Sequence, residues 1–204
     1  MRRIPLSRRS HVIGFQPLGT GTAEHESALE RDFVTVSSFL DPAASIISQP
    51  VTVSFHDGGV ARRYTPDYLV QRTNGPAELT EVKYRADLRA QWARFRPAFE
   101  AARLWAHEHD AVFRIATERR IRGTFLENAK RLLPLRRVSL DLRIVDAIVS
   151  IVRNQPEPTL GSVLDSLSVS RRAGLATLWR LLARQALQAD LRSAITLGTR
   201  VSLP

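Results

Sequence analysis

The sequence predicts an α/β fold, followed by a small module made mostly of helices. Short segments with the alternation of β-strands lie between residues 51 and 84. A long helical pattern over residues 86–109 then separates the last of these strands from an apolar run at residues 111–116. A strand–helix–strand succession pairs its strands in parallel and leaves helices on the faces of the sheet. After residue 135 the pattern becomes helical.

Residues 1–23 are rich in Arg, Ser, Gly and Pro and show no periodicity, so they predict a basic arm without regular structure. Such an arm either orders on a phosphate backbone or stays a solvated tail. Its candidate DNA-binding residues are Arg2, Arg3, Arg8 and Arg9.

The first helix is expected over residues 24–40, ending at Asp41-Pro42. Glu26 and Glu30 lie one turn apart along the edge of its apolar stripe. The stripe repeats at helical spacing through Leu29, Phe33, Val36 and Leu40.

Extended segments follow this helix. The turn signal Asp57-Gly58-Gly59 predicts a hairpin between its two flanking strands. The expected strands are residues 51–55, 60–64, 67–70 and 78–84. In the last strand Glu81 and Lys83 share one face, because side chains alternate along a strand.

The long helix of residues 86–109 carries an aromatic row that we interpret as core. The row consists of Trp92, Phe95 and Phe99. Residues 111–116 suit a strand covered on both faces, and residues 118–133 predict a further helix that stops before Pro134.

The C-terminal part contains three predicted helices, the first with Ser139 as a possible N-cap. Residues 159–167 form the second helix, and Leu175, Leu178 and Leu182 mark the third. The tail of residues 192–203 alternates around Gly198, as a hairpin does. Three helices and a hairpin fit a winged-helix module. The expected organisation is an arm at residues 1–23, a domain at residues 24–134 and a winged-helix-like domain at residues 135–204.

The chain carries a formal net charge of +10, with a pI near 11.3. This favours a polyanionic partner, nucleic acid first, with an acidic protein or lipid surface as the alternative. There is no cysteine, which excludes disulfides and thiolate zinc sites. The five histidines are not paired at ligand spacing. No apolar run is long enough to span a membrane and no secretory signal is found, so we expect a cytoplasmic protein without a membrane partner.

Lys83 is one of only two lysines in a chain that otherwise uses arginine. It follows Glu81-Val82, downstream of Asp67. Carboxylates are the ligands that Mg²⁺ prefers, so Asp67 and Glu81 are candidate metal ligands, with the carbonyl of Val82 as a third. Lys83 could orient a water or stabilise charge on a phosphorane. The alternative is a solvated Glu/Lys strand face and a turn Asp.

Residues 24–131 resemble the TnsA-type transposon endonucleases of the PD-(D/E)xK superfamily. The resemblance implies a restriction-endonuclease-like mixed sheet flanked by helices. The motifs that carry it are Ser27-Ala28-Leu29-Glu30, Phe39-Leu40-Asp41-Pro42, Gln49-Pro50-Val51, Tyr64-Thr65-Pro66-Asp67 and Glu81-Val82-Lys83.

The resemblance also implies roles. Glu30 matches the acid on the helix, with metal contact, and Glu26 is its rival. Asp67 matches the central metal-binding aspartate, Glu81 the variable acid and Lys83 the catalytic lysine. Gln49 is expected to support the site.

By the same resemblance, the chain hydrolyses DNA at the 5′ ends of a transposon, on the strand that is not transferred. The reaction uses Mg²⁺, for which Mn²⁺ would substitute. The implied partners are a TnsB-like DDE transposase and a TnsC-like AAA+ ATPase regulator. The C-terminal domain would contact the regulator, or its Arg171, Arg172, Arg180 and Arg184 would contact phosphates. The alternative for these arginines is a solvated helix face. Two alternatives remain: a stand-alone repair or resolving nuclease, and a non-catalytic DNA-binding adaptor.

Overall fold

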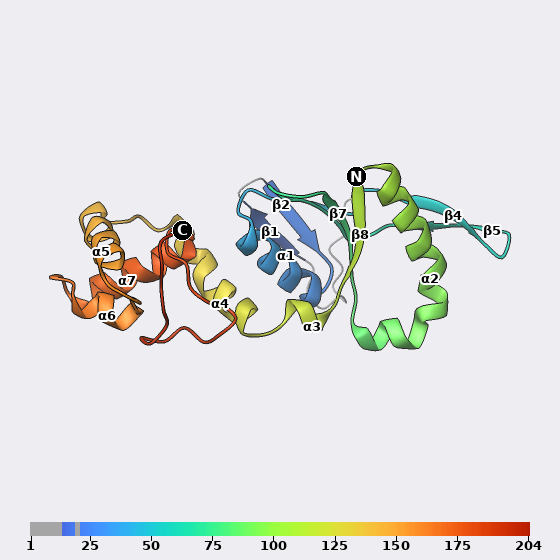
Figure 1. Cartoon of the computed structure of the whole chain (residues 1–204). Helices are drawn as coiled ribbons and strands as arrows, with labels where there is room; N and C mark the ends of the chain where they lie inside the picture. The colour runs from blue at the N-terminus through green and yellow to red at the C-terminus, as the bar shows by residue number, and fades with distance from the viewer. Residues whose placement is uncertain (1–13, 19–20) are drawn as a thin grey trace. The chain divides into compact units, whose positions relative to one another are not determined.

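The computed structural model describes residues 14–18 and 21–204, and the chain divides into two compact units (Figure 1). The first unit ends at Arg122 and the second begins at Gly123. From the sequence, this boundary was expected after Pro134. The difference arises because helix α4 (Thr124–Leu132) packs against α7 of the second unit.

The first unit is built on a four-stranded mixed sheet in the order β3-β6-β7-β8. Its strands are β3 (Ser45–Ser48), β6 (Tyr68–Gln71), β7 (Ala77–Val82) and β8 (Ala111–Ala116). The first three strands are antiparallel, whereas β7 and β8 are parallel, as the strand–helix–strand pattern predicted. This mixed sheet confirms the α/β fold class, although the edge strand β3 was not predicted.

Helices cover both faces of this sheet. Helix α1 (Ala28–Leu40) packs against one face, with Leu29 and Phe33 in a core that includes Tyr68 and Val70. Helix α2 (Arg85–Glu108) covers the opposite face, where Phe99 packs in a core with Leu79 and Phe113. Side chains alternate between the two faces along each strand. Glu81, two residues after Leu79, therefore lies on the face that α2 covers.

Helix α2 is kinked at Gln91, where the backbone leaves the helical region (φ −125°, ψ 21°). The expectation that its aromatic row is core holds for Phe99 but is wrong for Trp92, which is 47% exposed. The kink lies one residue before Trp92. No helix in the described part of the chain is both long and apolar enough to cross a membrane.

The predicted hairpin is confirmed as β4 (Val53–Asp57) and β5 (Val60–Tyr64). Its turn uses Gly58 and Gly59 at positive φ (58° and 81°), a conformation that glycine adopts without steric cost. The hairpin forms a separate two-stranded sheet and contacts α2 (Figure 1).

A second small sheet precedes α1. Strands β1 (Gly14–Leu18) and β2 (Gly21–His25) pair antiparallel. The prediction that no regular structure precedes residue 24 is therefore wrong here, because Ala23 and His25 are buried and β2 contacts β3. It also follows that the first helix begins at Ala28 rather than at residue 24. Arg2, Arg3, Arg8 and Arg9 lie outside the described residues.

The helix predicted over residues 118–133 is broken into two. Helix α3 (Glu118–Ile121) has Arg122 as its C-cap, and α4 starts after Gly123, whose φ of 140° is incompatible with a helix. A short 3₁₀ helix, η1 (Leu133–Arg137), follows α4.

The second unit contains the three predicted helices. They are α5 (Leu142–Asn154), α6 (Leu160–Asp165) and α7 (Arg171–Ala183). Asp141, not Ser139, caps α5, because its side chain accepts a hydrogen bond from the N–H of Arg143 (3.0 Å).

The C-terminal tail does not fold as a hairpin within residues 192–203. Its last residues pair with earlier parts of the unit, through antiparallel bridges Thr159↔Arg200 and Gln188↔Ser202. The N–H of Val201 also donates to the carbonyl of Pro158 (2.9 Å). Hydrogen bonds to residues far back in the chain are not visible as local alternation, which is why the tail was misread.

Candidate active site

The four predicted catalytic residues all lie in the first unit. Glu30 lies in the first turn of α1, and Asp67 immediately precedes β6. Glu81 lies near the end of β7, and Lys83 follows that strand. The pairing Tyr68↔Thr80 between β6 and β7 brings Asp67 beside Glu81. Lys83 contacts Glu81 (2.8 Å), and the charges of Asp67 and Glu30 also raise the pKa of Lys83.

Glu81 is the most enclosed of the four, with 3% of its surface exposed. Lys83 Nζ lies 2.8 Å from Glu81 Oε1. The hydroxyl of Tyr64 donates to Glu81 Oε2 over 2.6 Å. Hydrogen bonds to an ionised carboxylate are short and strong, so these two partners fix the orientation of the buried acid.

Lys83 keeps its positive charge in this environment. Burial alone lowers the pKa of a lysine, but the carboxylates of Glu81, Asp67 and Glu30 outweigh burial and raise the pKa of Lys83. Its Nζ also lies 5.8 Å from the centre of the Phe95 ring. Lys83 is therefore suited to stabilise negative charge, and not to accept a proton at neutral pH.

Asp67 is held by backbone groups at both ends. Its Oδ2 accepts a hydrogen bond from the N–H of Val82 (2.7 Å), and its carbonyl accepts one from the N–H of Gln49 (2.8 Å). Burial, and then the charges of Glu81 and Glu30, raise the pKa of Asp67 well above its usual range. The site therefore concentrates negative charge that a cation would neutralise.

The carboxylate of Glu30 is held by residues at the start of α1. Its Oε1 accepts from the hydroxyl of Ser27 (2.8 Å) and its Oε2 from the N–H of Glu26 (2.7 Å). Burial raises the pKa of Glu30 despite these hydrogen bonds. The rival residue Glu26 turns elsewhere and accepts a hydrogen bond from Gln49 Nε2 (3.0 Å). Of the two acids, Glu30 is the one coupled to Lys83 and Asp67.

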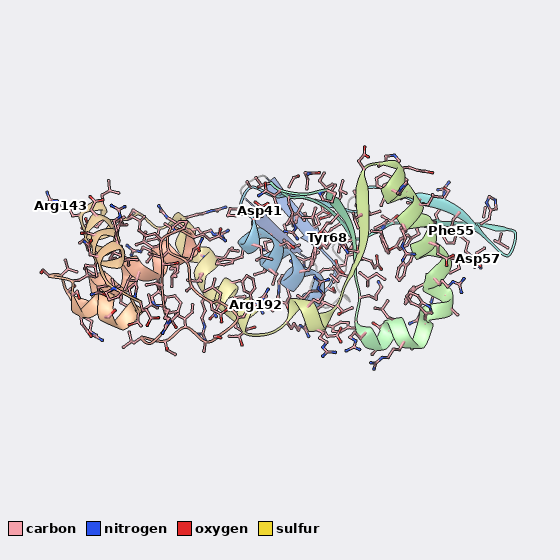
Figure 2. The ribbon with its side chains drawn as sticks, in the orientation of Figure 1. Asp41, Phe55, Asp57, Tyr68, Arg143 and Arg192 are labelled. Carbon is pink, nitrogen blue, oxygen red and sulfur yellow. The ribbon has the colours of Figure 1, made fainter. Side chains whose placement is uncertain are left out.

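Sequence reasoning missed two tyrosines that surround the site. Tyr64 binds Glu81 as described, and Tyr68 donates to the carbonyl of Glu24 (2.7 Å) while stacking on Phe33. Figure 2 labels Tyr68 within the first unit. Burial raises the pKa of both phenols, so both remain hydrogen-bond donors. In the sequence, Tyr64 opens the motif Tyr64-Thr65-Pro66-Asp67 and Tyr68 directly follows it, but nothing local indicated a role for either side chain.

The donor set suits a hard cation. Asp67 and Glu81 offer carboxylate oxygens, and Val82 between Glu81 and Lys83 offers a carbonyl, which are the ligand types that Mg²⁺ takes. In residues 14–18 and 21–204, no three or more His, Asp or Glu side chains gather in a metal-binding arrangement. A cation here would therefore rest on two carboxylates and the backbone, with Asp67 relieved of its like-charge neighbours.

The arginines of α7 divide into two groups. Arg180 donates to the carbonyl of Ser139 (3.0 Å) and Arg184 to the carbonyl of Val138 (2.7 Å), so both tie the end of α7 to the loop between η1 and α5. Arg171 pairs with Asp165 (2.7 Å), and Arg172 is exposed and borders a cavity of about 340 Å³. Of these four candidate phosphate contacts, Arg172 is thus the least engaged within the described residues.

A comparison with protein families relates part of the chain to a known family. Residues 42–118 match the family described as TnsA-like endonuclease N terminal. The matched segment contains Gln49, Asp67, Glu81 and Lys83, whereas Glu30 lies before it. No curated protein sequence matches the chain. The resemblance to the TnsA-type endonucleases is thus confirmed over the segment that carries three of the four site residues.

Proposed function

We propose, from the TnsA-like endonuclease match of residues 42–118, that the chain is the endonuclease subunit of a heteromeric transposase. It hydrolyses DNA phosphodiester bonds at the 5′ ends of a transposon, on the strand that is not transferred. The observation that carries the proposal is the contact of Glu81 with both Lys83 and Tyr64. It lies beside Asp67, whose pKa is raised by burial and by the charges of Glu81 and Glu30.

Asp67, Glu81 and the Val82 carbonyl would hold Mg²⁺, for which Mn²⁺ would substitute. When bound, the metal lowers the pKa of a coordinated water and neutralises charge on the phosphate. Lys83 orients the attacking water and stabilises the negative charge that develops on the phosphoryl oxygens. Glu30, anchored by Ser27, contributes negative charge that keeps Lys83 protonated.

The second unit is proposed to be a winged-helix domain. The order α5, α6, α7 and the bridges Thr159↔Arg200 and Gln188↔Ser202 support this, because a winged helix pairs its last strand with segments before the second and after the third helix. Such a domain would contact a TnsC-like AAA+ ATPase, or DNA through Arg172. A TnsB-like DDE transposase would cut and join the opposite strand and set the position of the nick.

The test is a nicking assay on transposon-end DNA with Mg²⁺, with and without a TnsB-like DDE transposase. We expect Lys83→Ala and Asp67→Asn to reduce nicking by at least about 100-fold, since each removes charge used in the transition state. Lys130→Ala is the matched control, because Lys130 pairs with Glu127 in the second unit, and should cut normally.

Unchanged cleavage by both site variants would contradict the proposed mechanism. Nicking that needs no transposase would instead indicate a stand-alone nuclease. DNA binding without any metal-dependent cleavage, even with the transposase present, would indicate a non-catalytic adaptor.

A further inference from the structure

A cavity of about 410 Å³ lies between the β4–β5 hairpin and α2, next to the candidate active site. Its walls carry three arginines, one acid and two aromatic rings. The residues used below are Phe55, Asp57, Arg62, Arg63, Tyr64 and Arg94. Phe55 and Asp57 lie on the hairpin where it runs beside α2 (Figure 2).

The floor of this cavity is fixed by packing. Val53 at the base of the hairpin is 8% exposed and pairs with Tyr64 across the two strands. The Tyr64 ring meets the Phe99 ring of α2 edge-on, with centroids 5.8 Å apart. The hairpin therefore does not need a ligand to hold its place against the helix.

The charges of the cavity are unbalanced. Arg62 is paired with Asp57 (3.0 Å). Arg63 is exposed and Arg94 bonds only weakly to Gln91 Oε1 (3.2 Å); within the described chain neither forms an ion pair with an acidic side chain. Two of the arginines that border this cavity thus have no acidic partner in the described chain, which favours an anion with more than one negative group.

The cavity and the active site share Tyr64. Its ring lines the cavity, while its hydroxyl donates to Glu81 over 2.6 Å. An anionic chain seated between the hairpin and α2 would therefore pass directly beside the carboxylate of the proposed nuclease site.

We propose that this cavity binds backbone phosphates of the DNA strand flanking the phosphodiester that is cut, with Arg63 and Arg94 as the contacts. The position beside a cleaved bond rests on the proposed function, but the binding itself does not require cleavage. A phosphate backbone fits because it presents repeated anionic groups to guanidinium donors, in a chain with net charge +10.

The experiment measures binding of a labelled DNA duplex by fluorescence anisotropy, without metal and in the Lys83→Ala background, between about 50 and 200 mM salt. The double variant Arg63→Ala/Arg94→Ala should bind DNA more weakly. The slope of log K against log salt concentration should become smaller in magnitude by about two, because each lost phosphate contact lowers that magnitude by close to one.

Arg96→Ala/Arg103→Ala is the control with the same charge change. These two arginines lie on the same helix, two and nine residues beyond Arg94 and about opposite to it around the helix axis. The control should keep a steeper slope than the cavity variant. Arg63→Lys/Arg94→Lys should keep most of the slope, and unchanged thermal melting should show that all variants fold.

Equal salt slopes for the cavity variant and the control would overturn the proposal. Binding of labelled polyglutamate is measured in the same way. If the variant Arg63→Ala/Arg94→Ala loses polyglutamate binding but keeps DNA binding, the proposal is overturned and the cavity is assigned to an acidic protein segment. The two proposals fail separately. A wild-type chain that binds through the cavity but never nicks contradicts only the nuclease function, and a nicking chain whose DNA affinity ignores Arg63 and Arg94 contradicts only the cavity.

Discussion

At the scale of single residues, the candidate site depends on how Glu81 is held. Tyr64 lies on one side of the carboxylate and Lys83 on the other. Burial and the charge of Glu81 raise the pKa of Tyr64, so its hydroxyl keeps the proton that it donates to Glu81. The unusual Lys83 was found from composition, but Tyr64 was not, because its partner is seventeen residues away and on another strand.

Tyr64→Phe removes one hydrogen bond and no packing. We expect a loss of about 1–3 kcal/mol in the free energy of unfolding, because a buried carboxylate oxygen loses its donor. The Mg²⁺ concentration for half-maximal nicking should rise roughly tenfold, the usual cost of losing a group that orients a ligand.

Metal titrations of nicking, and of the melting temperature, check both effects for Tyr64. Tyr84→Phe is the control, since its hydroxyl accepts from Arg122 (3.1 Å) and does not bind Glu81. An unchanged Mg²⁺ requirement in Tyr64→Phe would show that Tyr64 is structural only.

At the scale of elements, the sequence was informative where periodicity is strong. The succession β7, α2, β8 was predicted with its parallel pairing because each element is long and clearly patterned. Strands β1, β2 and β3 were missed, since four or five residues rich in Gly, Ser and Thr carry little alternation. The break at Gly123 was also missed, because no proline marks it and only its φ requires it.

Helix α1 shows how an element places a site residue. Ser27 accepts a hydrogen bond from the N–H of Glu30 (3.1 Å) and donates to its carboxylate. Ser27→Ala should therefore cost about 1 kcal/mol of stability, the typical value of a helix cap.

Urea unfolding measures this cost. Ser38→Ala, near the other end of the same helix, has its hydroxyl on the carbonyl of Thr35 (3.2 Å) and should cost less than Ser27→Ala. Equal losses in the two variants would mean that Ser27 does not anchor the helix start.

At the scale of the whole molecule, the candidate site is rich in acidic side chains although the chain as a whole is basic. The chain has a net charge of +10, yet Glu30, Asp67 and Glu81 gather in one site of the first unit. Burial and the two neighbouring acids raise the pKa of Asp67 in the folded state above 3.8, its value in an open chain. The folded protein thus binds this proton more tightly, and stability falls as pH rises from about 3.8 through the folded pKa.

Asp67→Asn should therefore stabilise the metal-free protein at neutral pH, by roughly 1 kcal/mol, as loss of a strained functional group often does. Its advantage should vanish below pH 3.8, where the aspartate is neutral in both states. Melting temperatures measured in a chelator across pH check this. Adding Mg²⁺ should raise the melting temperature of the wild type more than that of the variant. A variant less stable than wild type at neutral pH would contradict the charge argument.

The half-exposed Trp92 gives the molecule a built-in optical reporter. It follows the kink of α2 and meets the Phe99 ring, 6.1 Å away between centroids, while 47% of its surface faces solvent. Only three tryptophans occur in the chain, and Trp105 stacks on His109. Indole emission depends on exposure to water, so light emitted from Trp92 can follow events on the hairpin side of α2 without any attached dye.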